Sequence, residues 1–372
     1  MLAALLRIAA LTRKELLAVL KDRRARNSLL LPPILQCLIF GYAATYDLNH
    51  VPYAVLNQDG GPASRDLIAR FDGSGVFEHV ASLHRQSEIR SMIDGRRALL
   101  VLQIGSNFQR ELERGQPANV QVIADGRDSN TAATALSYAD AVIGGFNADW
   151  RAAHGLGDPP VSIEERAWYN PNLETRWNMI PGMIGTLTLL QTLLLTAMSV
   201  AREREEGTFD QLLVTPFRPF EIMAGKALPA MLIGLAQATG VLLVAQLWFH
   251  IPFAGSFVTL YAGLICFVLA SVGLGLMVSA FSYTMQQAML YSFLMIMPFS
   301  MLSGLTTPIG NMPLPLQYFT DINPLRYAVD IAQRVYLEGT GFFGLMPDLW
   351  PLAIMAVVTL AISSWIFHHR LQ

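Results

Sequence analysis

The sequence predicts an α-helical polytopic membrane protein with six transmembrane helices and an inserted α/β extracytoplasmic domain. Of its 372 residues, 53% are hydrophobic and only 15% are charged, whereas soluble domains carry charge at about a quarter of their positions. Six apolar stretches are each long enough, at about 20 residues, to cross a bilayer. Between the first two lies a segment of roughly 130 residues with the composition of a soluble domain.

Residues 1–27 form a basic amphipathic stretch. Leucines recur at helical spacing, and Arg7, Lys14 and Lys21 follow one another at intervals that place them on nearly one helical face. Such a helix can lie in the surface of a membrane, and a solvated leader that only sets topology is the alternative. Because a membrane span follows directly, anionic lipid is a better partner for this stretch than nucleic acid.

The six spans are expected at residues 28–45, 178–200, 222–249, 257–280, 287–305 and 349–368. Pro298 and Gly304 interrupt the fifth, so its bounds are the least defined. We expect the interiors of all six to lack Asp, Glu, Lys and Arg. Ion-coupled transporters usually keep such a costly group for function, so this expectation argues against a built-in ion-driven energy source.

Basic residues beside the spans set the expected orientation. Lys and Arg outnumber Asp and Glu before the first span, which places the N-terminus in the cytoplasm. Residues 46–175 contain no lysine and are expected outside. Six spans then return residues 201–219 and the C-terminus to the cytoplasm.

The extracytoplasmic segment, residues 46–175, alternates between strand and helix patterns. Strands are expected at residues 51–56, 76–83, 98–104, 120–124 and 161–168. Helices are expected at residues 63–71, 86–94, 108–113 and 131–154. This alternation predicts an α/β domain with a mixed or parallel sheet.

Residues 201–219 form a charged island between two apolar runs, and we expect an amphipathic coupling helix there. Glu203, Glu206 and Asp210 would share one face of that helix. The opposite face would carry apolar side chains, namely Phe209, Leu212 and Leu213. An amphipathic helix on the cytoplasmic side indicates a partner there, and our prediction is an ATPase subunit on another chain.

Residues 304–347 are too interrupted by proline and glycine for a full span. A good amphipathic helix is expected at residues 325–337, after Asn323 and Pro324. Short re-entrant or interfacial helices at this depth need protein or a wet cavity to satisfy their backbone. We therefore predict an outer gate, with an ordinary structured loop as the alternative; its residues would be Gly304, Pro308, Asn323, Pro324, Arg326 and Tyr327.

No G-x-x-x-x-G-K-[ST] phosphate loop occurs in the sequence, and the histidines lack metal-ligand spacing. We therefore expect no enzyme activity, no cofactor and no metal on this chain. Energy for any transport would have to come from a partner.

Two motifs resemble those of the permease subunit of a type-2 ABC transporter. The family block R-E-x-x-x-G-T-x-E-x-L-L-x-T-P, followed by G-K, is matched by Arg204, Glu206 (offset by one residue), Gly207, Thr208, Leu212, Leu213, Thr215, Pro216, Gly225 and Lys226. Asp210 stands where a glutamate is common. The run from Asn323 to Tyr327 resembles the family's N-P-x-x-Y/F block. A large insert after the first span resembles the efflux branch.

This resemblance implies a dimer of permeases, with a second copy or a paralogue, and separate ABC ATPase subunits that bind ATP and Mg. It implies that the helix before the first span, with Arg13 and Lys14, and the 201–219 segment form the ATPase contact. In that segment we assign the contact to Arg202, Glu203, Arg204, Glu206, Gly207, Thr208, Asp210, Leu212, Leu213, Thr215 and Pro216.

Efflux members often work with a periplasmic adaptor protein. Apolar spans and a methionine-rich fifth span indicate a hydrophobic substrate, for which a drug, a lipid and a peptide are the alternatives. The alternative is a membrane-anchored binding module or receptor that acts through residues 46–175, although six spans exceed what an anchor needs.

Overall fold

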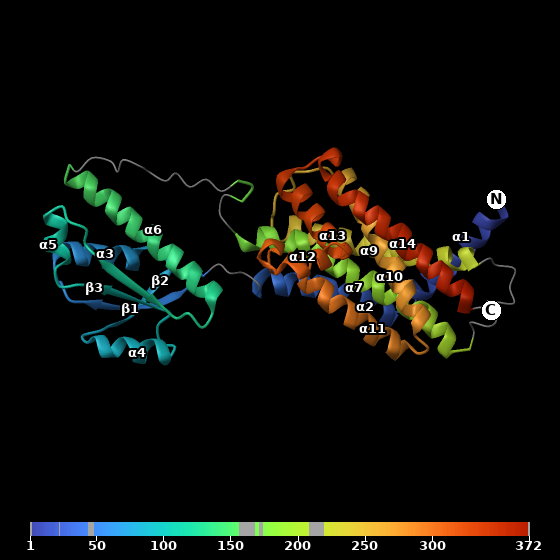
Figure 1. Cartoon of the computed structure of the whole chain (residues 1–372), viewed down its shortest axis with the longest axis horizontal. Helices are drawn as coiled ribbons and strands as arrows, with labels where there is room; N and C mark the ends of the chain where they lie inside the picture. The colour runs from blue at the N-terminus through green and yellow to red at the C-terminus, as the bar shows by residue number, and fades with distance from the viewer. Residues whose placement is uncertain are drawn as a thin grey trace. The chain divides into compact units, whose positions relative to one another are not determined.

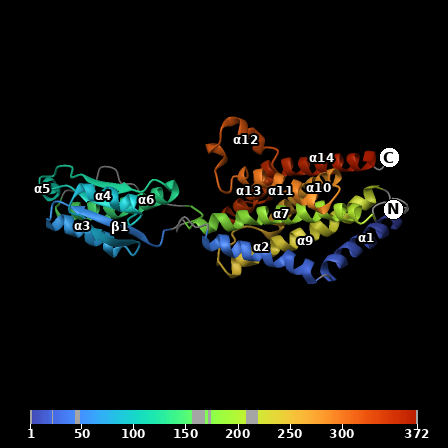
Figure 2. The same cartoon turned by 90° about the horizontal axis from the view of Figure 1, so that it is seen from below.

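The computed structural model describes residues 2–21, 23–43, 48–155, 168–170, 174–207 and 219–370. The chain divides into two compact units. One, an α/β unit, comprises Thr45–Arg166, and the other, a helical unit, comprises Met1–Ala44 and Ala167–Gln372. Figures 1 and 2 show the elements of each unit.

The α/β unit is built on a four-stranded mixed sheet. Its strands are β1 (Val51–Asn57), β2 (Phe77–Ser82), β3 (Leu100–Ile104) and β4 (Val120–Ala124). The strand order is β2-β1-β3-β4, in which β1 is parallel to both neighbours and β4 is antiparallel to β3. Its helices are α3 (Pro62–Gly73), α4 (Gln86–Asp94), α5 (Phe108–Glu113) and α6 (Ser129–Ala153).

Strand β1 is buried on both faces, because helices cover the two sides of the sheet. Tyr53 and Val55 belong to the core formed with α3, α5 and α6, whereas Ala54 and Leu56 belong to the core formed with α4. Figure 1 shows α6 and α4 on opposite sides of the sheet. Four strands and four helices lie where the sequence predicted them, and the strand predicted at residues 161–168 falls almost wholly outside the described residues.

The long helices of the helical unit are α1 (Leu2–Lys21), α2 (Arg23–Ala43), α7 (Thr175–Glu205), α9 (Pro219–Leu247), α10 (Phe257–Phe281), α11 (Met285–Met301) and α14 (Met346–Arg370). Among the described residues, 4 helical segments are long and apolar enough to cross a membrane: Thr175–Glu205, Glu221–Leu247, Phe257–Phe281 and Phe342–Ile366. The apolar part of α2, Leu31–Tyr42, is shorter, and α11 has 17 residues. Spans at these last two positions remain predictions.

Helix α10 packs against α7, α9, α13 and α14, and glycines of α10 lie at its contacts with α7, α13 and α14. A β-carbon added at Gly275 would lie 2.8 Å from Cβ of Thr196 on α7, and one added at Gly273 would lie 2.1 Å from Oγ1 of Thr359 on α14. Glycine lets helix backbones approach this closely, which is how helices associate inside membranes.

The segment after α11 consists of short helices, as the sequence predicted. These are η1 (Ile309–Asn311), α12 (Leu314–Thr320), α13 (Pro324–Gln333), the single π-helical turn η2 (Arg334–Glu338) and η3 (Phe342–Leu345). Asn323 caps the start of α13 by accepting the backbone N–H of Leu325, and Pro324 occupies the first helical position. Gly339, at φ 70°, ends the π turn in a left-handed conformation.

Candidate functional site

Lys226 lies where α1, the end of α7 and the start of α9 meet. Its Nζ is 2.6 Å from Oε2 of Glu203 on α7 and 3.7 Å from Oε1 of Glu15 on α1. It also donates a hydrogen bond of 3.2 Å to Oγ of Ser199. Since only 1% of the Lys226 side chain is exposed, one buried ammonium group joins three helices.

The expectation that span interiors lack ionisable side chains is wrong at Lys226. This residue lies inside α9 and within the third predicted span. The physical reason is its pairing, because Glu203 and Glu15 compensate for the water that the ammonium group loses on burial. The G-K pair of the family motif was the only signal in the sequence that pointed to this position.

A second ion pair, between the half-buried Arg7 and the buried Glu221, joins α1 to α9. Nη2 of Arg7 lies 2.6 Å from Oε1 of Glu221, and Nε of Arg7 donates to Oε2 over 3.0 Å. The Glu221 side chain is only 4% exposed. This bidentate geometry fixes the orientation of both side chains as well as their distance.

Gly225 brings the two helices into direct contact between these ion pairs. A β-carbon at residue 225 would lie 2.4 Å from Cδ2 of Leu11. From one contact to the next the residue numbers increase on both helices, so α1 and α9 run in the same direction. They lie side by side, as in Figure 2. We call this contact the α1–α9 seam; it consists of Arg7, Leu11 and Glu15 on α1 and Glu221, Gly225 and Lys226 on α9.

The end of α7 makes further contacts within the chain. Nη1 of Arg204 donates to the backbone oxygens of Ala280 and Ser282, each over 3.2 Å. Glu205 accepts the backbone N–H of Met285 over 2.8 Å. The helix stops at Glu205, and Gly207 follows at φ 69°.

These contacts place the first residues of the predicted coupling helix, 201–205, in α7, whereas residues 208–218 lie outside the described part of the chain and the helix predicted there stays a prediction. Glu203 lies in the last turn of α7 and is paired with Lys226. A left-handed glycine commonly ends a helix, and Gly207 separates Glu203 from the rest of the island. Glu203 and Arg204 therefore hold α7 in place within this chain.

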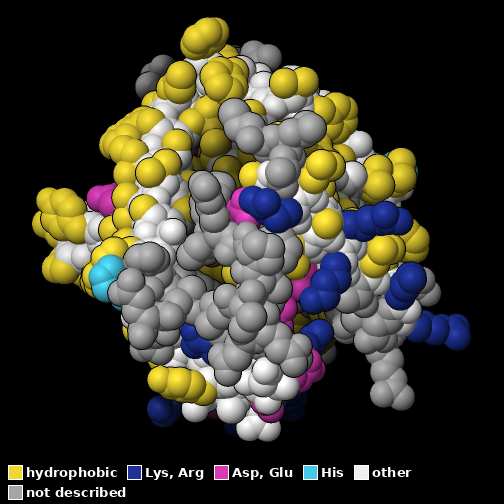
Figure 3. All heavy atoms as spheres, turned by 90° about the vertical axis from the view of Figure 1, so that its right-hand side faces the viewer, with side chains coloured by type: hydrophobic (Ala, Val, Ile, Leu, Met, Phe, Trp, Pro, Cys, Tyr) yellow, Lys and Arg dark blue, Asp and Glu magenta, His cyan; other side chains and the backbone are white. Residues whose placement is uncertain are grey.

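Other predicted coupling residues do lie on the surface. Arg13, Lys14, Arg202, Glu206 and Gly207 are exposed. Figure 3 shows this end of the helical unit, where basic side chains gather beside a few acidic ones. The remaining predicted contacts lie outside the described residues: Thr208, Asp210, Leu212, Leu213, Thr215 and Pro216.

Two of the predicted gate residues line a cavity of about 260 Å³. Gly304, at φ 88°, and Arg326 line it, whereas the exposed Pro308 precedes η1. The full lining is Ser303, Gly304, Ile309, Arg326, Val329, Asp330, Gln333 and Asp348. The structure thus brings two of the predicted gate residues to one cavity, and their role as a gate stays a prediction.

Arg326, Tyr327 and Asn323 hold this segment together. Arg326 donates to Oγ1 of Thr320 over 2.6 Å and pairs with Asp321, whose backbone oxygen accepts a 3.1 Å hydrogen bond from the Tyr327 hydroxyl. Asn323 is buried. These contacts tie the start of α13 to the end of α12.

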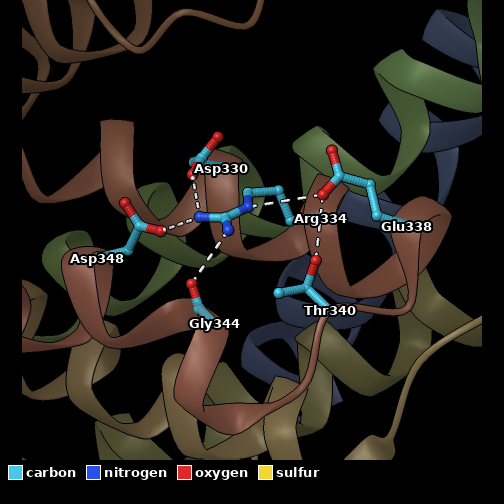
Figure 4. Close-up of polar contacts among 6 residues, drawn as sticks. All are labelled: Asp330, Arg334, Glu338, Thr340, Gly344 and Asp348. Atoms are coloured by element: carbon cyan, nitrogen blue, oxygen red, sulfur yellow. Dashed lines mark hydrogen bonds and ion pairs between the residues drawn. The ribbon is translucent and has the colours of Figure 1, made fainter.

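Arg334 is the centre of a charged cluster that the sequence analysis missed (Figure 4). Its Nη1 lies 2.8 Å from Oδ2 of Asp348 and 3.4 Å from Oδ2 of Asp330, and its Nε lies 3.7 Å from Oε2 of Glu338. Nη2 donates to the backbone oxygen of Gly344 over 3.0 Å. The four-residue spacing of Asp330, Arg334 and Glu338 was a signal that could have revealed part of it.

The chain is similar to known transport proteins over almost its whole length. The model of the "ABC-2 family transporter protein" family matches residues 28–365. A "Probable multidrug ABC transporter permease YbhR" of Escherichia coli (strain K12) is 37% identical, with 98% of this chain and 99% of the relative covered.

Two further relatives are more distant. "Probable multidrug ABC transporter permease YbhS" of the same strain is 29% identical, with 90% of this chain and 89% of the relative covered. "Linearmycin resistance permease protein LnrN" of Bacillus subtilis (strain 168) is 21% identical, with 95% and 97% covered. The chain therefore belongs to the ABC-2 family of transporter proteins, as a type-2 ABC permease.

Proposed function

We propose that this chain is the permease subunit of an ATP-driven exporter in a bacterial inner membrane. It forms the translocation path together with a second copy or a paralogue, and a separate ATPase subunit supplies ATP and Mg. The observation that carries the proposal is the end-to-end match with a relative whose name is that of a multidrug ABC transporter permease. By analogy with that name, we propose small hydrophobic compounds as the substrate.

The exposed charged residues at the α1 end of the helical unit support an ATPase contact there. Arg13 and Lys14 on α1 and Arg202 at the end of α7 are basic and exposed, and Glu206 is acidic and exposed. A surface of both charge signs suits a partner that presents complementary charges. This end would be cytoplasmic, with both termini on the same side.

We assign Thr45–Arg166 to the periplasm, where it would dock an adaptor protein or guide substrate. It has its own sheet and its own core, as a domain inserted between two membrane helices needs. Deleting this unit should abolish export while the remaining chain still reaches the membrane. Full export without it would contradict the assignment.

The test of the proposed function is purification of the tagged chain from its native membrane in mild detergent, with mass spectrometry of the proteins that co-elute. A P-loop ATPase at near-stoichiometric amount is the expected result. If the chain elutes without an ATPase, or only with a periplasmic protein, the exporter proposal fails and the result favours a membrane-anchored receptor.

A matched pair of double variants then tests the contact itself. Glu206→Ala with Asp210→Ala should weaken ATPase association, because both remove acidic groups from the proposed contact. Glu78→Ala with Asp140→Ala removes two exposed carboxylates from the α/β unit and should leave association unchanged. Equal association of both double variants would exclude the role of Glu206 and Asp210.

A further inference from the structure

We propose that Lys226 is a positioning residue that makes α1, the end of α7 and the start of α9 one rigid body. A displacement of α1 by the ATPase would then move the membrane helices α7 and α9 directly. This inference rests on the proposed function, because it concerns how the partner's motion reaches the membrane helices. It goes beyond that function in assigning the step to one buried ammonium group.

The polarity of the two ion pairs fixes the register of the α1–α9 seam. In the first pair, α1 contributes the cation (Arg7) and α9 the anion (Glu221). In the second pair, α1 contributes the anion (Glu15) and α9 the cation (Lys226). Sliding α1 forward by one turn, about 5.4 Å, would bring Arg7 toward Lys226 and set like charges together. Sliding it the other way would carry Arg7 away from Glu221 and leave that buried carboxylate unpaired by α1, so either movement is opposed.

Burial of one partner makes these pairs harder to break than ion pairs on the surface. The exposed fractions of the Lys226, Glu221 and Glu203 side chains are 1%, 4% and 11%, and those of Glu15 and Arg7 on α1 are 20% and 35%. Exposed ion pairs exchange readily with water and contribute little, whereas separating a buried pair leaves a charge without compensation. Leu11 adds a steric contact, since it fills the space that Gly225 leaves open.

Lys226 extends this rigid contact from the seam to α7. Glu203, its 2.6 Å partner, immediately follows the exposed Arg202 in the last turn of α7. The exposed residues of α1 and the exposed end of α7 therefore sit on elements joined by one buried side chain. Removing the ammonium group should loosen α1 from both helices while leaving the exposed residues in place.

The first test joins α1 to α9 covalently in the full complex. Leu11→Cys and Gly225→Cys are introduced with Cys37→Ser and Cys266→Ser, so that no other thiol remains. A β-carbon at residue 225 would lie 2.9 Å from Cβ of Leu11, so a slight separation brings the two sulfurs within bonding range. Each single-cysteine variant serves as a control.

If α1 and α9 move together, the oxidised protein transports substrate as fast as the same protein after reduction. Transport that stops on oxidation and returns on reduction would mean that the helices move apart during the cycle, and would overturn the proposal. The reductant leaves the single-cysteine controls unaffected in either case.

The second test compares Lys226→Met, which removes the charge, with Lys226→Arg, which keeps it. We expect Lys226→Met to retain its ATPase partner but to hydrolyse roughly tenfold more ATP per substrate exported, while Lys226→Arg stays close to the original protein. Hydrogen exchange of α1 in the purified chain should rise in Lys226→Met and not in Lys226→Arg. Adding Glu203→Gln to Lys226→Met should change little more, because the two residues act as one pair.

The two hypotheses fail in different ways. Absence of a co-purifying ATPase from the original protein contradicts the proposed function. An ATPase that co-purifies with every variant, together with equal coupling and equal exchange of α1 in Lys226→Met and Lys226→Arg, contradicts the role of Lys226 alone.

Discussion

Asn323 fastens the start of α13 to the end of α11, because its Nδ2 donates a 2.8 Å hydrogen bond to the backbone oxygen of Phe299. The same amide nitrogen donates to the backbone oxygen of Leu302 over 3.2 Å, and its Oδ1 accepts the N–H of Leu325 over 3.0 Å. One buried side chain thus satisfies backbone groups of two helix ends.

Replacing Asn323 should destabilise the helical unit in an order set by hydrogen-bond chemistry. Asn323→Ala leaves buried carbonyl groups unpaired, which costs about 1–3 kcal/mol. Asn323→Asp should be worse, since an ionised carboxylate cannot donate to these oxygens. Thermal unfolding in detergent measures both, with the exposed Asn311→Ala as the control. Asn323→Asp as stable as the original protein would show that donation is not what matters.

Arg334→Met should destabilise the contact between the π turn and α14. The substitution removes the donors to Asp348 and to Gly344 while leaving the mostly buried Asp348 carboxylate in place, which costs about 1–3 kcal/mol. Arg334→Lys keeps the charge but loses the planar guanidinium group, so its stability should lie between that of the original protein and that of Arg334→Met. Unfolding midpoints of the three proteins give the comparison; equal midpoints for Lys and Met would assign the whole effect to geometry.

Gly273→Ala should disturb the packing of α10 on α14. Its new β-carbon would meet Oγ1 of Thr359 at 2.1 Å and the backbone nitrogen of Leu360 at 3.0 Å, so the helices must separate, at a cost of about 1–3 kcal/mol. Gly240→Ala on α9 is the matched control, because nothing lies within 4 Å of its added β-carbon. A loss of stability as large at residue 240 as at residue 273 would contradict this reason.

Asp128→Ala should loosen the start of α6. The carboxylate of Asp128 accepts the backbone N–H groups of Asn130 and Thr131 over 3.1 and 3.2 Å. Hydrogen exchange by mass spectrometry should show faster exchange in the first turn of α6, whereas Asp140→Ala, an exposed change on the same helix, should not alter it.

The effect of Asp128 should depend on pH in one direction. The backbone N–H of Thr131 donates to Asp128 and holds the pKa of this carboxyl below its usual value. Its contribution is therefore complete above the ordinary carboxyl pKa and is lost as the pH falls through the lowered value. The difference in exchange between Asp128→Ala and the original protein should shrink over that acidic range; a constant difference would exclude the carboxylate as its source.

Strong periodic patterns were enough to predict most helices and strands. The short, mostly apolar run of β1 and the long apolar runs of α7, α9 and α10 each specify an element through burial alone. The two apolar regions at α2 and α11 are harder to assign, because Pro298 shortens one and the apolar stretch Leu31–Tyr42 of the other is short.

Partners far apart in sequence set the limits of prediction at the site. Nothing near Glu203 in the sequence indicates that it faces inward, because its partner Lys226 lies on another helix. Exposure of Glu206 and burial of Glu203 depend on where α7 stops, which Gly207 decides. Arg334 likewise has one partner on α14 that local spacing does not reveal.

The seam between α1 and α9 also orders the biosynthesis of this chain. Arg7 and Glu221 are 214 positions apart. At ordinary rates of translation, α9, against which α1 packs, therefore leaves the ribosome roughly ten to forty seconds after α1. During this interval Arg7 and Glu15 lack the partners on α9 that they have in the folded chain. Helix α1, the first segment to be synthesised, is thus among the last to reach its native neighbours. In a chain truncated before α9, these ion pairs of α1 cannot form.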